Sequence, residues 1–302
     1  MRTKKFIPDL RGLLFLLGVA AFLSVIQNAH AYEQVLFSSL ETKVELTGYL
    51  VRPEGEGPFP AVVMMHGCGG LVHSGAVSPL YSSWAQTFSK LGLAVLMVDS
   101  AGSRRLGATC TKGKERVRMY RERPKDAYGA LAYLQAQKFI RADRIGLVGW
   151  SQGGAVVLLS AVQGSIGRPV PPPRHDFAAA AAFYPALCND RIQSRPFTKV
   201  APGTWSTMIP LLVLQGGADN WTRPGPCEEF IEAVKRRGSP VSMVVYPGAY
   251  HGFDAPALKM RELPRYKTVT GVIPIVGTNK EARQDALKRL PAFLSKYLLS
   301  EN

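Results

Sequence analysis

Short apolar runs and stretches with helical periodicity alternate along the chain from residue 33 onward. The apolar runs are typical of buried strands and occupy residues 35–37, 44–49, 61–65, 93–99, 145–148, 177–183, 209–214 and 242–246. Between them, apolar residues recur at helical spacing at 80–91, 115–137, 155–161, 228–237 and 281–299. Pro124 is expected to break the second of these helices. The pattern predicts an α/β fold, with a mostly parallel sheet and helices on both faces, in a single domain.

One predicted strand leads directly into a Gly-x-Ser-x-Gly pentapeptide. The strand at 145–148 is followed by Gly149-Trp150-Ser151-Gln152-Gly153 and then by the helix at 155–161. This context is typical of the nucleophile elbow of α/β-hydrolases, whose strained turn raises the serine hydroxyl clear of the sheet. The Gln152 N–H then lies at the positive end of the helix. Ser151 is therefore the candidate nucleophile, and an ordinary glycine-rich turn is the alternative.

Polar or glycine-rich clusters follow four of the predicted strands, at residues 66–70, Ser151, Asp219 and His251. The carboxyl ends of parallel strands meet at one edge of a sheet, where reactive groups gather. A serine hydroxyl needs a base to take its proton, and a carboxylate holds the imidazole in the required tautomer. Ser151, Asp219 and His251 follow the chain order of α/β-hydrolases. They predict a Ser-His-Asp triad.

Other histidines and acids are weaker candidates for these roles. Only His251 follows the last predicted strand, whereas the remaining histidines lie near the N-terminus or in loops, namely His30, His66, His73 and His175. The competing acids are Asp190 and Asp254. Asp254 lies three residues from His251, which is too close in sequence for an easy approach of carboxylate to imidazole.

The glycine-rich segment His66-Gly67-Cys68-Gly69-Gly70 predicts an oxyanion loop. Backbone N–H groups that point at the developing oxyanion are usually the largest electrostatic contribution to acyl transfer. We expect the N–H groups of Gln152 and Cys68 to be the two donors, with Gly67 and Gly69 as alternatives to Cys68. A plain glycine-rich turn is the other interpretation.

The first 31 residues have the pattern of a secretory signal peptide. Basic residues precede an apolar run at 12–26 and an Ala-x-Ala site, and the residues concerned are Arg2, Lys4, Lys5, Arg11 and Ala29-His30-Ala31. We predict cleavage after Ala31, export to the periplasm or the medium, and a hydrolase domain at 32–302. The alternative is an uncleaved membrane anchor, but the apolar run is shorter than the ~20 residues that a span needs.

Charge and cysteine content exclude some classes of function. The leader carries four basic residues and one acidic residue, so its removal lowers the net charge from +15 to +12. A basic protein can bind nucleic acid, but no basic run is interleaved with aromatic residues, and we expect no such role. No Cys-x-x-Cys pair occurs and no histidine lies at ligand spacing from a cysteine, so no metal site is expected.

The four cysteines lie in the part predicted to be exported, where disulfides are permitted. Four cysteines allow three pairings. Cys68 and Cys110 each follow a predicted strand on the side where Ser151 emerges, while Cys188 and Cys227 follow the strands that end near 186 and 219. We predict the pairs Cys68–Cys110 and Cys188–Cys227, the first bracing the oxyanion loop and the second the acid loop.

The combined motifs resemble the dienelactone hydrolase family of α/β-hydrolases over residues 59–299. The residues that carry the resemblance are those of the oxyanion loop and the elbow up to Gly154, together with Asp99-Ser100, Tyr184-Pro185, Gly217-Ala218-Asp219 and Tyr246-Pro247-Gly248-Ala249-Tyr250-His251-Gly252-Phe253. The resemblance implies one domain, a serine or cysteine triad, and neither a metal nor an organic cofactor. Members often carry an arginine after the strand at 93–99, and Arg104 matches it; with Trp150, it is our candidate substrate contact. The alternative is that Arg104 and Arg105 are solvated or pair with a local Asp or Glu.

The chain departs from the family's namesake in three respects. Ser151 replaces a cysteine nucleophile, the chain has an export signal, and the segment 254–279 lengthens the step from the histidine to the final helix. We therefore expect a serine hydrolase that cleaves lactones or carboxylic esters, small or polymeric. Its substrates are expected to carry a free acid group if Arg104 lies at the mouth of the site. A serine peptidase of the same fold and a non-catalytic binding protein are the alternatives.

Overall fold

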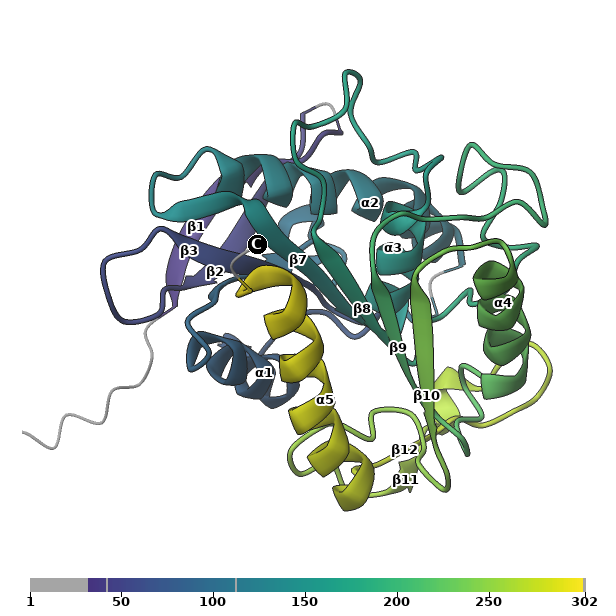
Figure 1. Ribbon diagram of the computed structural model, residues 1–302. Helices are drawn as coiled ribbons and strands as arrows, with labels where there is room; N and C mark the ends of the chain where they lie inside the picture. The colour runs from purple at the N-terminus through teal and green to yellow at the C-terminus, as the bar shows by residue number, and fades with distance from the viewer. Residues whose placement is uncertain (1–31, 42, 112, 301–302) are drawn as a thin grey trace, which may run out of the picture. The chain divides into compact units, whose positions relative to one another are not determined.

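In this computed structural model, the candidate residues Ser151, Asp219 and His251 follow the carboxyl ends of strands β7, β9 and β10 of one sheet. The structure describes residues 32–41, 43–111 and 113–300, and within these ranges eight strands pair in the order β1-β2-β6-β3-β7-β8-β9-β10. They are β1 (Glu33–Ser38), β2 (Glu45–Val51), β3 (Phe59–Met65), β6 (Ala94–Asp99), β7 (Ile140–Trp150), β8 (Ala179–Phe183), β9 (Leu211–Gly216) and β10 (Val241–Tyr246) (Figure 1). The β1–β2 and β2–β6 pairs are antiparallel and the other pairs are parallel. The prediction of a mostly parallel sheet is confirmed.

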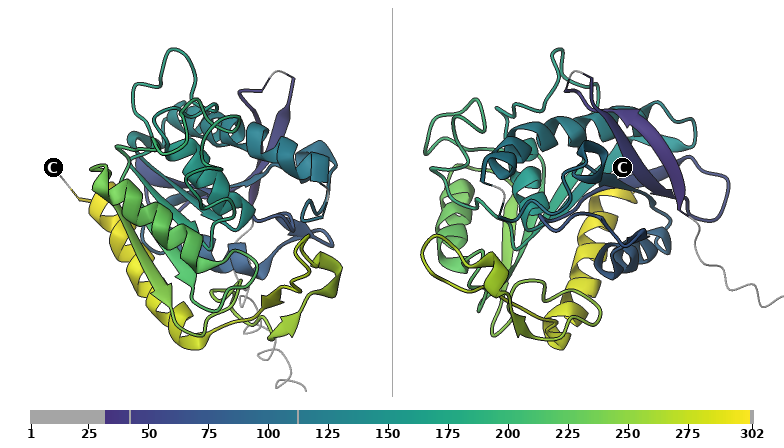
Figure 2. Two further views of the ribbon diagram at one scale, coloured as in Figure 1. Left: turned by 90° about the vertical axis from the view of Figure 1, so that its right-hand side faces the viewer. Right: turned by 180° about the vertical axis from the view of Figure 1, so that it is seen from behind.

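Helices cover both faces of the sheet, as the alternating pattern predicts. They are α1 (Pro79–Ser89), α2 (Gly113–Gln135), α3 (Gln152–Ala161), α4 (Pro224–Arg236) and α5 (Lys280–Leu298). The core on one face contains apolar residues of α1 and α5, and the core on the other contains those of α2, α3 and α4. Figures 1 and 2 show α1 and α5 together on one side of the sheet and α2 and α3 on the other.

The strands contribute to the two cores alternately because successive side chains of a strand point to opposite faces. In β3, Ala61, Val63 and Met65 pack on the face of α2 and α3, whereas Val62 and Met64 pack on the face of α1 and α5. A strand that is buried on both faces has no polar alternation in its sequence. This explains why the central strands are continuous apolar runs.

One sequence expectation needs correction, and two further features were not anticipated. Pro124 lies inside α2 and does not break it; the helix loses one backbone bond there but buries a long apolar face against β3, β7 and α3. A short hairpin, β4 (Val72–His73) with β5 (Ala76–Val77), was not anticipated. The segment 254–279 contains its own antiparallel pair, β11 (Arg261–Glu262) with β12 (Ile275–Val276).

The predicted signal peptide lies outside the described residues, and the residues from Tyr32 onward form one unit. Among the helices that the structure describes, none combines the length and the apolar character needed to cross a bilayer.

Candidate active site

The elbow after β7 has the backbone strain that its sequence predicts. Ser151 has a φ of +54°, a left-handed conformation that is rare outside glycine. A Cβ on Gly153 would lie 2.0 Å from Met65 O, and one on Gly149 would lie 2.2 Å from Gly153 O. Both positions therefore require glycine. The Ser151 N–H donates to Phe183 O at 2.9 Å, which ties the turn to the end of β8.

Backbone hydrogen bonds hold the loops after β9 and β10 against each other. Gly217 N donates to Tyr246 O at 2.8 Å, and Ala218 N donates to Ala249 O at 3.0 Å. These loops carry Asp219 and His251, which are 32 residues apart in the chain. The structure thus brings the two predicted residues together.

Asp219 and His251 form a buried hydrogen-bonded pair. His251 Nδ1 lies 2.7 Å from Asp219 Oδ2, and the side chains are 7% and 0% exposed. The other carboxylate oxygen, Oδ1, accepts from the N–H groups of Trp221 and Thr222 at 2.8 and 2.9 Å. Thr222 Oγ1 donates to Asp219 Oδ2 at 2.8 Å and lies 3.1 Å from His251 Nδ1. A carboxylate held by three donors is fixed in orientation, and it fixes the imidazole in turn.

The two competing acids are engaged elsewhere. Asp190 pairs with Arg237, the residue that follows α4. Asp254 is completely buried and accepts from three neutral donors, the indoles of Trp84 and Trp150 at 2.8 and 2.7 Å and the Tyr184 hydroxyl at 2.7 Å. Burial raises the pKa of the Asp254 carboxyl, and the three hydrogen bonds oppose that rise.

Trp150 is a core residue and not a substrate contact, so that expectation is wrong. It is 1% exposed, stacks on Phe183 with ring centroids 5.3 Å apart, and donates to Asp254. Because β-strand side chains alternate between faces, the residue before the elbow points into the core. The aromatic residues that line the pocket include Tyr120, Phe197 and Trp221, and the ring centroid of Trp221 lies 4.9 Å from that of His251.

The oxyanion loop after β3 lies directly beside the elbow. A Cβ on Gly67 would be 3.5 Å from Ser151 Cβ. The Gly67 N–H already donates to the Tyr81 hydroxyl at 2.8 Å. This makes Gly67 a poor alternative donor and favours Cys68, which lines the same pocket as Ser151 and Gln152.

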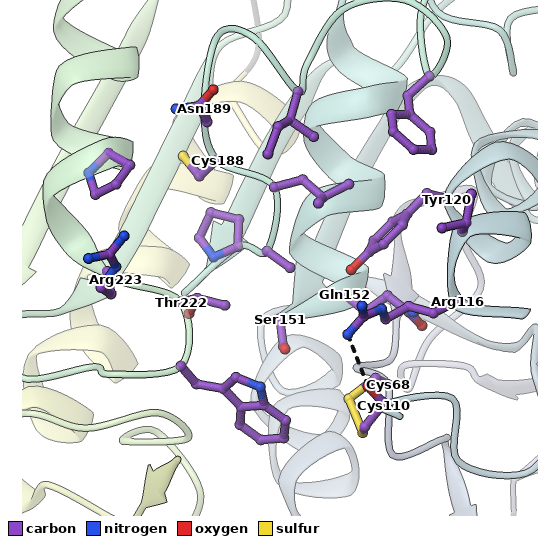
Figure 3. A pocket seen from close by; sticks show the side chains of 18 of the residues that line it. Cys68, Cys110, Arg116, Tyr120, Ser151, Gln152, Cys188, Asn189, Thr222 and Arg223 are labelled. Atoms are coloured by element: carbon purple, nitrogen blue, oxygen red, sulfur yellow. Dashed lines mark hydrogen bonds between the residues drawn. A yellow bond between two sulfur atoms is a disulfide. The ribbon is translucent and has the colours of Figure 1, made fainter. Parts of the chain in front are cut away.

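Both predicted disulfides are present in the structure, Cys68–Cys110 and Cys188–Cys227. The first lies at the pocket, below Ser151 in the view of Figure 3. It joins the oxyanion loop to the loop before α2, and Thr109 N adds a 2.7 Å hydrogen bond to Cys68 O. The second joins the loop after β8 to α4.

A pocket of about 720 Å³ opens above Ser151. Arg116, Arg191 and Arg223 line it, and no acidic residue does so among the described residues. Figure 3 shows Arg116 and Arg223 on opposite sides of Ser151. In the described part of the chain, none of the three arginines forms an ion pair.

Arg104 does not line the pocket, so its predicted role as a substrate contact is wrong. Its side chain is 5% exposed and forms a bidentate pair with Asp126, both contacts at 2.8 Å. Its remaining N–H groups bond to Glu122, Glu41 and Ser100 O. The loop after β6 begins at the side of the sheet where Ser151 emerges, as expected. Its 3₁₀ turn at Gly102–Arg104, however, directs Arg104 toward α2.

Sequence reasoning missed Thr222, Trp221 and the three pocket arginines. Thr222 and Trp221 directly follow Asp219, so their proximity to the predicted acid was an available signal. The arginines come from three separate loops or helix ends, and only the fold brings them together. Within the described ranges, no three His, Cys, Asp or Glu residues form a group that could hold a metal ion.

A profile of the dienelactone hydrolase family matches residues 46–298. The chain belongs to this family. It is 25% identical over 210 residues to a Bradyrhizobium sp. protein described as a 2-oxo-3-(5-oxofuran-2-ylidene)propanoate lactonase, a match that covers 68% of this chain and 77% of that protein.

Two solved structures have a similar fold. A Klebsiella pneumoniae protein described as a dienelactone hydrolase is 18% identical with a TM-score of 0.64, covering 88% of this chain and 100% of that chain. Thermogutta terrifontis esterase 2 is 20% identical with a TM-score of 0.60, covering 90% and 97%. The family and the fold place the chain among the carboxylic ester hydrolases.

Proposed function

We propose that this chain cleaves carboxylic esters or lactones through an acyl-enzyme on Ser151, with His251 as the base and Asp219 as its orienting acid. The observation that carries the proposal is the 2.7 Å contact between His251 Nδ1 and Asp219 Oδ2, beside the pocket that Ser151 lines. With its proton on Nδ1 and donated to Asp219, the imidazole presents Nε2 as an acceptor. That tautomer is the one a general base requires.

The reaction has two steps that mirror each other. Nε2 takes the Ser151 hydroxyl proton as Oγ attacks the acyl carbon, and the carbonyl oxygen becomes an oxyanion bound by the N–H groups of Cys68 and Gln152. Collapse of this intermediate breaks the bond to the alcohol oxygen, which takes the proton from Nε2. Water then attacks the acyl-enzyme with the same proton transfers, releasing the carboxylic acid and restoring Ser151.

Substitution of Ser151 and His251 tests this mechanism. Ser151→Ala and His251→Ala should each lower kcat for a short acyl ester by ~10⁴–10⁶-fold, because the two residues act as one unit. Retention of a tenth of the wild-type kcat by either folded variant would contradict the assignment. A fluorophosphonate probe should label only Ser151, and esterase 2 of Thermogutta terrifontis is described in a form phosphorylated by paraoxon, a related reagent. Absence of labelling would instead favour a binding protein.

The pocket arginines favour substrates that carry a free carboxylate. Arg116, Arg191 and Arg223 line the pocket, and Arg116 Nη1 is held by a 3.2 Å hydrogen bond to Cys110 O. A guanidinium can bind a carboxylate bidentately. These residues replace Arg104 in the substrate hypothesis.

Paired esters test the role of these arginines. The kcat/KM values for a neutral ester and its carboxylated analogue are compared in wild type, Arg116→Gln and Arg223→Gln. At least one variant should lose ~10-fold on the carboxylated ester alone, about 1.4 kcal/mol of transition-state binding. Equal losses on both esters, or no loss, would mean that the arginines do not recognise a substrate carboxylate.

A further inference from the structure

A second buried arginine, Arg123 of α2, lies beneath the elbow and is 0% exposed. Its Nη1 donates to Gln152 Oε1 at 3.0 Å, and its Nη2 donates to His66 O at 2.6 Å. Gln152 and the loop that starts at His66 carry the two proposed oxyanion donors. One planar guanidinium therefore connects the two segments whose spacing determines the oxyanion site.

Thr109 makes a parallel connection between the same segments. Its Oγ1 donates to Gln152 Oε1 at 3.1 Å, and its N–H donates to Cys68 O at 2.7 Å. Gln152 lines the pocket but is only 1% exposed, and its amide oxygen is engaged in this internal network. The amide oxygen of Gln152 accepts from both Arg123 and Thr109, which fixes the side chain of the residue next to the nucleophile.

Arg123 differs from Arg104 in how its charge is balanced. Among the described residues, Arg123 forms no ion pair. Asp126 is the acid that most favours the charged form of Arg123, but its carboxylate is bound bidentately by Arg104. Burial lowers the pKa of Arg123 to about 10, so the group remains charged at neutral pH. A buried charge without a bonded counterion is costly unless other interactions compensate. Negative charge that develops nearby during the reaction would be stabilised by it.

We propose that Arg123 is a positioning residue of the oxyanion site, which sets the spacing of the Cys68 and Gln152 N–H groups and places an uncompensated positive charge behind them. It does not contact substrate, because it is absent from the residues that line the pocket. The inference rests on the proposed serine-hydrolase function. It predicts that loss of Arg123 weakens transition-state binding more than substrate binding.

The experiment compares Arg123→Lys and Arg123→Met with wild type. Lysine keeps the positive charge but lacks the two N–H groups that bond Gln152 Oε1 and His66 O together, whereas methionine removes both the charge and these donors. We expect kcat for a neutral ester to fall ~10-fold in Arg123→Lys and ~100-fold in Arg123→Met, with KM nearly unchanged. The affinity for a trifluoromethyl ketone, which forms an oxyanion adduct with the serine, should fall in parallel. The affinity for the ketone's secondary alcohol, which forms no adduct, should not change.

Arg104→Lys is the control, since it alters an arginine whose side chain is only 5% exposed and that bonds neither segment of the oxyanion site. It should lower Tm while kcat and ketone affinity stay within ~2-fold of wild type. The proposal is overturned if the Arg123 variants fold and keep wild-type kcat and ketone affinity, or if ketone and alcohol weaken equally.

A further variant covers the case in which Arg123→Met does not fold. Gln152→Met removes the amide that Arg123 binds but keeps the backbone N–H. It should lower kcat and ketone affinity together, and unchanged values would overturn the proposal. Failure of the proposed function would be seen separately, because wild-type Ser151 would then not react with the fluorophosphonate probe.

Discussion

Buried polar side chains around the elbow are stabilised in different ways, although their sequence context does not distinguish them. Arg104 is surrounded by carboxylates, Arg123 donates to neutral oxygens, and Asp254 accepts from neutral donors. His66 is also buried, and its Nε2 accepts from the Ala101 N–H at 3.4 Å while Nδ1 lies 2.6 Å from Gly67 O. This pattern corresponds to a neutral imidazole with its proton on Nδ1.

His66 should make the protein less stable in mild acid. Burial, followed by the charge of Arg123, holds the pKa of His66 well below its usual value in the folded state. The unfolded chain then binds one proton more than the folded chain as pH falls below ~6.5, and stability falls with it. Between pH 7.5 and pH 5 the loss of unfolding free energy from this group is at most about 2 kcal/mol, the limit in which the folded state takes up no proton.

Urea unfolding of wild type and His66→Gln across this pH range measures the effect. In His66→Gln, the unfolding free energy should fall less steeply with falling pH, because the contribution of His66 is gone. His73→Gln, which changes an exposed histidine, should keep the pH dependence of wild type. The same slope in wild type and His66→Gln would show that other groups produce the acid sensitivity.

At the scale of elements, the candidate active site is assembled from loops that two disulfides restrain. Cys68–Cys110 spans 42 residues and joins the oxyanion loop to the loop before α2. Cys188–Cys227 spans 39 residues and joins the loop after β8 to α4. Because the two spans are nearly equal, the loss of chain entropy in the unfolded state is nearly equal too. Their effects on stability should therefore match, and their effects on catalysis should not.

Removal of each bridge separates these two effects. Cys68→Ser with Cys110→Ser, and Cys188→Ser with Cys227→Ser, should each lower the unfolding free energy by about 2–4 kcal/mol. Only the first pair frees the loop that carries an oxyanion donor, so it should cause the larger fall in kcat. Denaturant titration and steady-state kinetics on the two double variants measure both quantities. A larger fall in kcat for the second pair would argue against Cys68 as a donor.

The positions of the main strands along the chain, the elbow and the chain order of the candidate triad were predictable because each depends on local patterns. Buried strands lack polar residues, and the tight turn at Ser151 requires glycines at 149 and 153. The direction of side chains in loops was not predictable in this way. Arg104 lies in the loop after the correct strand end but points into the protein, because its contacts with Asp126 decide its orientation. Trp150, by contrast, is the last residue of β7, and the alternation of strand side chains could have placed it in the core.

Similarly, the continuity of α2 through Pro124 depends on packing that no local signal encodes. Arg123, the residue before Pro124, is likewise buried by the packing of α2 and not by any local signal. Sequence analysis therefore could not assign residues whose placement depends on contacts between distant segments, such as Arg123 and the pocket arginines.

For the whole molecule, the predicted export and the pairing of the cysteines in disulfides support each other. All four cysteines are paired, and structural disulfides are typical of compartments outside the cytosol. Expression of the full chain in a secretion-competent bacterium should give a product that begins at Tyr32 with no free thiol. Intact-mass and thiol measurements on the exported fraction test this. A membrane-bound product that keeps residues 1–31 would support the anchor alternative.

The segment 254–279 is fixed at its base and largely independent at its tip. Gly277 N donates to His251 O at 3.1 Å and Asn279 N donates to Phe253 O at 3.0 Å, whereas the turn around Thr268 bonds mainly to itself. Thr268 nevertheless lines the pocket. Insertions or replacements in this turn would therefore reshape one wall of the pocket without moving the histidine. It offers protein engineers, and natural selection, a place to diversify the acceptable leaving groups while the chemistry is retained.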